Sequence, residues 1–253
     1  MTAATVKIVA PSAVANESKA RTFRLLKLEN RTVAWAMPTD GSARTLTWAI
    51  ARRPSREAGA RNCGLIVPPT KTLGQTGLSS AGFERLVASA FAAWANIGVF
   101  RFERVNDPQR ANILIGEQAR PRGIAYANVT LSGAPRSEPR HGPQALRRAR
   151  VCLNGKAPWK VGFDGDLQRY DLTYVLMHEI GHALGLDHPG ASGQVMSWRY
   201  EERFATLQPG DIAGLKLLYG RGAGSPVTRR AAAPAARPSL GIARRKRSAP
   251  PRR

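Results

Sequence analysis

Three of the four histidines in the chain lie within eleven residues of one another, at positions 178, 182 and 188. His178 and His182 are four residues apart, so a helix would project both side chains from one face, one turn apart. Two imidazole nitrogens could then bind one metal ion. His188 is too far along the chain to share that face. Gly185 has no Cβ, however, and would let the chain turn sharply and bring His188 to the same ion.

Three neutral nitrogen ligands leave a fourth position open for water, which is typical of a catalytic metal site and not of a closed structural one. Imidazole ligands suit Zn²⁺, and we expect one such ion. Glu179 directly follows the first ligand. It is expected to face the water, where its carboxylate can accept a proton during attack on a peptide carbonyl. The alternative is a helix with purely structural histidines, which the clustering of three disfavours.

Hydrophobic periodicity predicts the elements that must hold these residues. Intervals of three and four predict a packing helix over 80–96, a helix over 172–184 that carries the first two histidines, and a last helix over 209–219. Extended segments are expected at 32–37, 45–50, 100–105, 113–115, 124–131 and 151–153. The apolar segment 113–115 is expected to be a buried central strand.

Met196 follows His188 by eight residues. Together with the long motif from His178 to His188, this resembles the metzincin clan of zinc metalloproteases, in which a Met-turn forms a hydrophobic floor beneath the metal. The short distance from His188 to Met196, and the pattern of the final helix over 207–220, are similar to the matrixin family. The resemblance covers about residues 44–221.

This resemblance implies an α/β (α+β) fold with a zincin-like catalytic domain: a twisted mixed β-sheet, a packing helix, an active-site helix and a C-terminal helix. It implies a zinc-dependent endopeptidase that cleaves proteins or peptides, as in the extracellular matrix. An extended substrate would add to a sheet edge. Secretion is also implied, although residues 12–15 resemble a signal-peptide cleavage site only faintly and the apolar segment before them is short.

The sequence also departs from the matrixin pattern. Residues 188–190 and 196–198 look more like the serralysins, but the glycine-aspartate repeats that follow a serralysin domain are absent. A second zinc would need more histidines, and only His141 remains. Asp164 and Asp166 are the best calcium candidates, but turn formation explains them equally well, so calcium is left open.

Cys63 and Cys152 are the only cysteines. A disulfide is possible if they lie close in the fold. The apolar neighbours of Cys152 nevertheless favour a buried free thiol, and Cys63 is expected to be an ordinary loop thiol. Because Cys63 follows the presumed first catalytic strand, the thiol latency device of the matrixins is not expected.

The net charge of +22 indicates attraction to anionic partners. We predict a polar N-terminal extension over 1–30, flexible in one interpretation, a catalytic domain over 31–221, and a disordered basic tail over 222–253. The tail either tethers the protein to an anionic partner or is simply solvated. Apolar runs are too short to span a bilayer, so no transmembrane segment is expected, and the protein is expected to be a monomer.

A function of another class stays open at this point. The protein could be a non-catalytic binder of nucleic acid or anionic surfaces, with a structural zinc. Two features of the sequence disfavour this alternative: Glu179 would have no role in such a site, and the basic tail lacks interleaved aromatic residues for base stacking.

Overall fold

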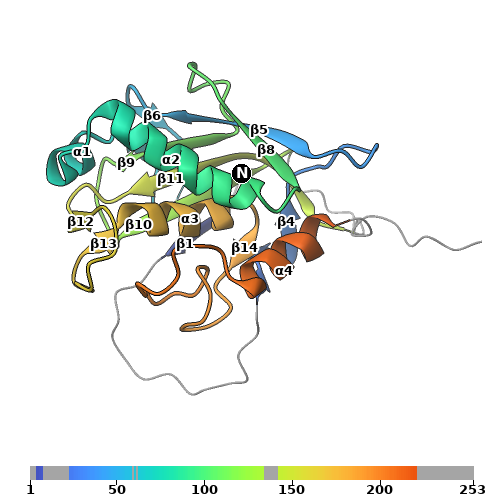
Figure 1. Cartoon of the computed structure of the whole chain (residues 1–253). Helices are drawn as coiled ribbons and strands as arrows, with labels where there is room; N and C mark the ends of the chain where they lie inside the picture. The colour runs from blue at the N-terminus through green and yellow to red at the C-terminus, as the bar shows by residue number, and fades with distance from the viewer. Residues whose placement is uncertain (1–3, 8–22, 59, 61, 134–141, 221–253) are drawn as a thin grey trace, which may run out of the picture.

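The core is a mixed sheet covered on one face by two long helices, in a computed structural model that describes residues 4–7, 23–58, 60, 62–133 and 142–220 (Figure 1). The principal strands, in spatial order, are β1 (Ala4–Lys7), β10 (Ala125–Leu131), β11 (Gln144–Leu153), β9 (Ile113–Gln118), β5 (Arg44–Ile50) and β8 (Phe100–Arg104). β10 runs antiparallel to both of its neighbours, whereas β11, β9, β5 and β8 are parallel.

Shorter strands extend this sheet or form ribbons beside it. They are β2 (Arg24–Leu25), β3 (Lys27–Leu28), β4 (Arg31–Ala34), β6 (Ser55–Arg56), β7 (Leu65–Val67), β12 (Trp159–Lys160), β13 (Tyr170–Asp171) and β14 (Leu186–Asp187). β2 pairs with β14, and β3 pairs with β4. Three strands of the extension predicted over 1–30, namely β1, β2 and β3, are thus joined to the catalytic region, although the domain boundaries themselves stay predictions.

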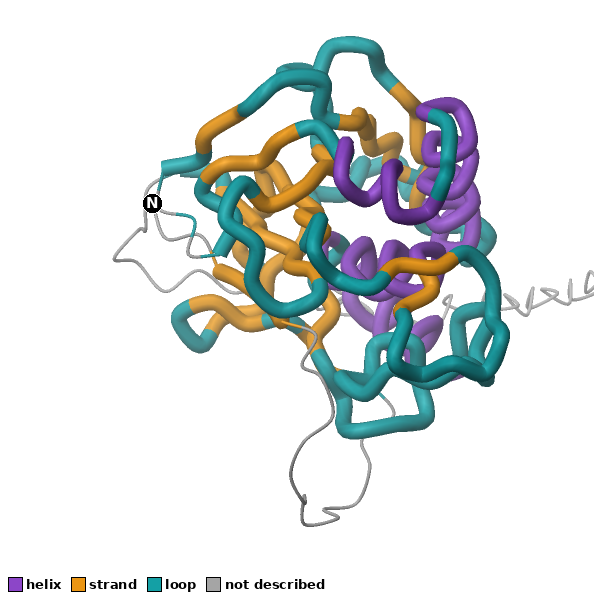
Figure 2. Tube along the Cα trace, turned by 90° about the vertical axis from the view of Figure 1, so that its left-hand side faces the viewer, coloured by secondary structure: helices purple, strands orange, loops and turns teal. Residues whose placement is uncertain are grey.

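The helices are α1 (Thr70–Thr76), α2 (Ser80–Ala95), α3 (Leu172–Ala183) and α4 (Pro209–Tyr219). Figure 2 shows most of the strands gathered on one side of the long helices. The Ser79 hydroxyl caps α2 by accepting a hydrogen bond from the Gly82 N–H at 3.0 Å. The indole N–H of Trp94 in α2 donates to the Met177 carbonyl of α3 at 3.0 Å, which joins the two helices. The packing helix and the two later helices agree with the predicted ranges to within a residue or so.

β11 is longer than the predicted strand over 151–153, and the reason is buried charge. Arg150 is buried within β11, yet its guanidinium donates to the Ser55 carbonyl at 2.9 Å and pairs with Glu57 at 3.1 Å. An arginine with these partners can occupy the interior of a sheet. In the sequence alone, the several arginines of this segment are typical of a solvated loop.

The favoured interpretation of the cysteines was wrong. Cys63 and Cys152 form a disulfide between the segment before β7 and the end of β11, and both are buried. They are separated by 89 residues. Their proximity depends on the pairing of β11 with β9 and of β9 with β7, which composition and spacing do not reveal.

Several predicted features lie outside the described residues: the basic tail over 222–253, His141 and the cleavage-like residues 12–15. Within the described part of the chain, no helix is both long enough and apolar enough to cross a membrane.

Candidate active site

α3 positions the first two histidines. The Asp171 carboxylate caps its N-terminus by accepting a hydrogen bond from the Tyr174 N–H at 2.7 Å, as expected of a carboxylate at a helix start. The helix ends at Ala183 because Gly185 has a φ of +96°, a backbone conformation that residues with a Cβ rarely adopt. The chain then continues through β14 to His188. The sharp bend predicted at Gly185 is therefore confirmed.

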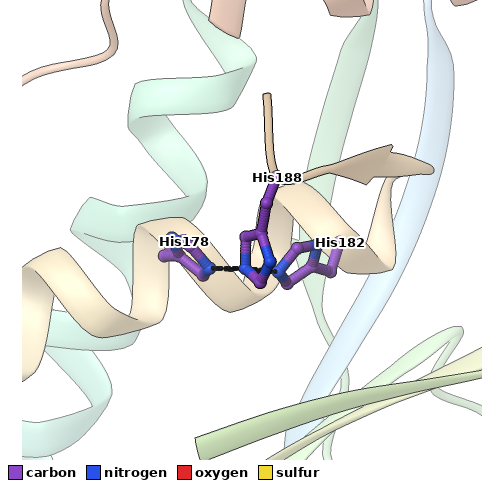
Figure 3. Close-up of side chains that lie close together, drawn as sticks. All are labelled: His178, His182 and His188. Carbon is purple, nitrogen blue, oxygen red and sulfur yellow. Dashed lines mark hydrogen bonds between the residues drawn. The ribbon is translucent and has the colours of Figure 1, made fainter. Parts of the chain in front are cut away.

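The three imidazoles converge on one point (Figure 3). The Nε2 atoms of His178 and His182 are 3.0 Å apart, and the Nε2 atom of His188 lies 3.0 Å from the first and 3.1 Å from the second. Among the described residues, this is the one group that brings three metal-ligating side chains together. The structure thus unites the three histidines that were predicted from their spacing.

The hydrogen bonds of the other ring nitrogens fix the state of these imidazoles. Nδ1 of His178 lies 2.7 Å from the Val195 carbonyl, and Nδ1 of His182 lies 2.8 Å from the Leu186 carbonyl. A carbonyl can only accept, so each Nδ1 carries the hydrogen and each Nε2 presents a lone pair. Burial lowers the pKa of His178 to about 3 and that of His188 to about 4, so both rings are neutral at pH 7.

Converging lone pairs repel one another unless a cation lies between them. Bonds of about 2.0–2.1 Å to a tetrahedral zinc would place ligand nitrogens about 3.3 Å apart, close to the observed separations. The donor set and its geometry therefore fit Zn²⁺, held by His178, His182 and His188.

Glu179 is fully buried beside these ligands. Neither carboxylate oxygen has a hydrogen-bond partner among the described residues. Burial raises the pKa of Glu179 well above its usual value, and the nearby backbone N–H of Ala127 in β10 offsets only part of that effect. A buried carboxyl group without a partner destabilises a fold. Such groups cluster at functional sites, where a ligand or a water supplies the missing interaction.

Met196 packs directly against the metal-binding helix. A Cβ atom added at Gly181 would meet its sulfur at 2.2 Å, so the methionine lies against the helix backbone between the two histidines. The backbone at Met196 is held in place by Asp211. Its carboxylate accepts hydrogen bonds from the N–H groups of Val195 and Met196, each at 3.0 Å. Asp211 also accepts a hydrogen bond from the Gln208 N–H at 2.8 Å, as a carboxylate at the start of α4.

A lysine explains the acidic residues considered for calcium. The ammonium group of Lys160 forms ion pairs with Asp164 and Glu202 and donates to the Asp166 carbonyl at 2.6 Å. Burial alone would lower the pKa of Lys160, but its hydrogen bonds to the two carboxylates outweigh burial and raise that pKa. The Asp166 carboxylate accepts the Gln168 N–H at 3.0 Å, as in a turn. The Lys160 ammonium group thus supplies these acidic residues with the positive charge that a calcium ion would otherwise provide.

Comparison with known proteins gives a consistent result. The family model of matrixin matches residues 70–220. Metalloendoproteinase 1-MMP from Arabidopsis thaliana is 32% identical over 152 residues, which cover 56% of this chain and 39% of that protein. Stromelysin-3 from Mus musculus is 33% identical over 138 residues, covering 53% and 26%. Karilysin from Tannerella forsythia is 29% identical over 147 residues, covering 56% and 30%. The matched regions thus span well under half the length of these curated relatives.

Proposed function

Because the chain belongs to the matrixin family of zinc metalloendopeptidases, we propose that it hydrolyses peptide bonds at the three-histidine centre, with Glu179 as general base. The observation that carries this proposal is the convergence of three Nε2 atoms beside a buried carboxyl group whose burial is only partly compensated by the Ala127 N–H. The family resemblance supports the reaction class, and the local geometry supports the individual roles.

Zinc held by the three Nε2 atoms would polarise the substrate carbonyl and lower the pKa of a water in the fourth position to about 7. Glu179 would accept a proton from the attacking water and transfer it to the nitrogen of the leaving amine. The Val195 and Leu186 carbonyls hold the rings of His178 and His182 in the tautomer that binds a metal. Met196 packs against α3 at Gly181 and supports the helix there.

Substitution of Glu179 by glutamine tests its role. The variant keeps the shape of the side chain but cannot accept the proton, so cleavage of a denatured protein should fall by about 10²–10⁴-fold. Zinc content, measured by elemental analysis, should stay at one ion per chain. Glu103→Gln, on the exposed side of β8, is the matched control and should cleave normally. Cleavage at an undiminished rate by Glu179→Gln would assign the proton transfer to another group.

Removal of the metal tests the centre as a whole. Dialysis against a zinc chelator should abolish cleavage, and added Zn²⁺ should restore it, because the three histidines are the metal-ligating side chains that converge within the described part of the chain. Zinc should also raise the melting temperature, since an ion that binds only the folded state stabilises it. A metal-free protein that cleaves at full rate would contradict the proposal.

A non-catalytic binder with a structural zinc is the weaker alternative. Structural zinc sites have four protein ligands, whereas three converge here, and the buried carboxyl of Glu179 would have no purpose. The charge of +22 remains the one feature that favours an anionic partner. Binding to nucleic acid that persists in Glu179→Gln, together with an absence of cleavage in the unaltered chain, would favour this alternative.

We also propose that the protein acts outside the cytosol, on protein or peptide substrates. The Cys63–Cys152 disulfide supports this location, because such bonds persist mainly in oxidising compartments. Counting free thiols in protein recovered from the culture medium of its host checks the proposal. Retention of the chain in the cytosol with two free thiols would contradict it.

A further inference from the structure

The edge of the sheet that lies nearest the metal centre carries a short strand from the chain's own N-terminus. β1 is the outermost strand on the β10 side and pairs antiparallel to β10 over four residues. In this register Val6 lies opposite Ala127, and Lys7 lies opposite Tyr126. About 120 residues separate the two strands in the sequence, so the pairing is a tertiary contact and not a hairpin.

β10 is also the strand beside the proposed general base. α3 packs against β10. Glu179 lies on α3, and the backbone N–H of Ala127 in β10 lies beside its carboxyl group. The residues of β10 that β1 pairs with are therefore the ones that adjoin the catalytic carboxyl group.

A strand edge can pair with only one partner at a time. Each backbone N–H and C=O on the outer side of β10 offers one hydrogen-bonding position to a neighbouring strand. An extended peptide that reaches the metal centre by adding to this edge would need the same groups. β1 and such a peptide consequently exclude each other.

β1 runs along the β10 edge past the proposed general base. From Ala4, opposite Val129, the chain runs to Lys7, opposite Tyr126, so its C-terminal end is the end that approaches Ala127 and Glu179. β1 thus lies on the stretch of β10 that a substrate strand would need in order to reach the proposed general base.

We propose that β1 is a built-in competitor of the substrate: residues 4–7 occupy the β10 edge and must leave it before a peptide can be cleaved. This inference rests on the proposed function for its consequence, but not for the contact itself. Because β1 spans only four residues, the competition is reversible. The apparent affinity for a peptide is then reduced by the fraction of time for which the edge is open.

A binding experiment tests the contact without relying on cleavage. A fluorescent peptide with the sequence of residues 1–10 is added to two Glu179→Gln chains, one complete and one that lacks residues 1–10. Fluorescence anisotropy should show binding to the shortened chain, and at least about tenfold weaker binding to the complete one. The same peptide with Val6→Pro should bind neither, because proline removes a backbone donor and disfavours the pairing. Equal binding to both chains would overturn the proposal.

Kinetics on the catalytically intact chain test the consequence. Removal of residues 1–10 should lower the KM for a denatured protein about tenfold, if the edge is open about a tenth of the time, and leave kcat unchanged. Val6→Pro in the complete chain should act in the same direction, and it serves where the shortened chain does not fold. Ala13→Pro, outside β1, is the control. If no variant cleaves anything while the peptide binds as expected, the proposed function fails and the contact stands. An unchanged KM in every variant overturns the competition.

The register itself can be tested with an engineered disulfide. Thr5 and Asn128 lie directly opposite each other in the pairing, at a separation that a disulfide can bridge. Oxidised Thr5→Cys/Asn128→Cys should be inactive because β1 can no longer leave, and its rate is compared with that of Asn128→Cys alone, which carries the same change in β10 without the crosslink. Full activity of the crosslinked chain would show that β1 does not block the substrate.

Discussion

At the scale of single residues, the metal centre depends on groups that never touch the metal. The His178 ring is oriented by the Val195 carbonyl, and the N–H groups of Val195 and Met196 are held by Asp211. The buried carboxylate of Asp211 therefore connects α4 to the first metal ligand through two backbone positions. Burial raises the pKa of Asp211, and three backbone N–H groups offset part of that rise.

Replacement of Asp211 by alanine should weaken both stability and activity. It would leave three backbone N–H groups without a partner in the interior, so we expect the free energy of unfolding to fall by about 3 kcal/mol. Zinc affinity or activity should fall about 10–100-fold, the usual effect of removing a residue that orients a ligand. Denaturant unfolding and zinc titration measure the two effects. Asp107→Ala, at an exposed turn, is the control and should change stability by less than about 0.5 kcal/mol. Equal behaviour of the two variants would show that Asp211 has no supporting role.

At the scale of elements, local patterns were sufficient for some parts of the fold and insufficient for others. α2, α3 and α4 have regular apolar spacing, and the ligands of the metal centre lie within one short segment, so both could be predicted. α1 contains Gly74 among polar residues and has no such spacing. β11 contains arginines, and a buried one is tolerated in the sheet only because it has hydrogen-bond and ion-pair partners there. β1 is four residues long, and its partner lies far away in the sequence.

The same distinction applies within the site. Residue type and spacing could predict His178, His182 and His188 as ligands, and Glu179 as the general base, because their relation in the sequence is local. The carbonyls that orient the rings, and the second role of Asp211, arise from tertiary contacts between α3, α4 and the loop before Met196. A single sequence contains no sign of such contacts.

The bend after α3 is the element on which the third ligand depends. Substitution of Gly185 by alanine would strain a φ of +96° and place a Cβ 2.6 Å from the Val33 carbonyl oxygen. We expect the free energy of unfolding to fall by about 2–4 kcal/mol and zinc affinity to fall as His188 moves away. Gly190→Ala is the matched control, because its Cβ would meet no atom within 4 Å. A Gly185→Ala chain that keeps full zinc affinity would mean that the bend does not position His188.

At the scale of the whole molecule, the two faces of the sheet are stabilised differently. The helices cover one face with the main hydrophobic core, which includes Val151 and Leu153 of β11. The side chain between them, Cys152, belongs to a second and smaller cluster on the opposite face, together with Cys63 and Leu114. Most other members of this cluster are alanines, so it buries less apolar surface, and the disulfide stabilises a face that none of the described helices covers.

Removal of the disulfide should therefore lower the stability of the fold and leave the cleavage rate nearly unchanged. The bridge closes a loop between cysteines that are 89 residues apart, and this loop restricts the unfolded chain. Without the bridge the unfolded chain regains that entropy, so the free energy of unfolding should fall by about 4 kcal/mol in Cys63→Ala/Cys152→Ala. The three histidines lie on the other side of the sheet, in α3 and beyond it, so the folded variant should cleave at nearly the normal rate at low temperature. Calorimetry gives the change in melting temperature, and initial rates at about 10 °C below the new Tm give the activity. A matching loss of kcat/KM in fully folded protein would mean that the far face of the sheet also positions the metal centre, through the pairing of β11 with β10.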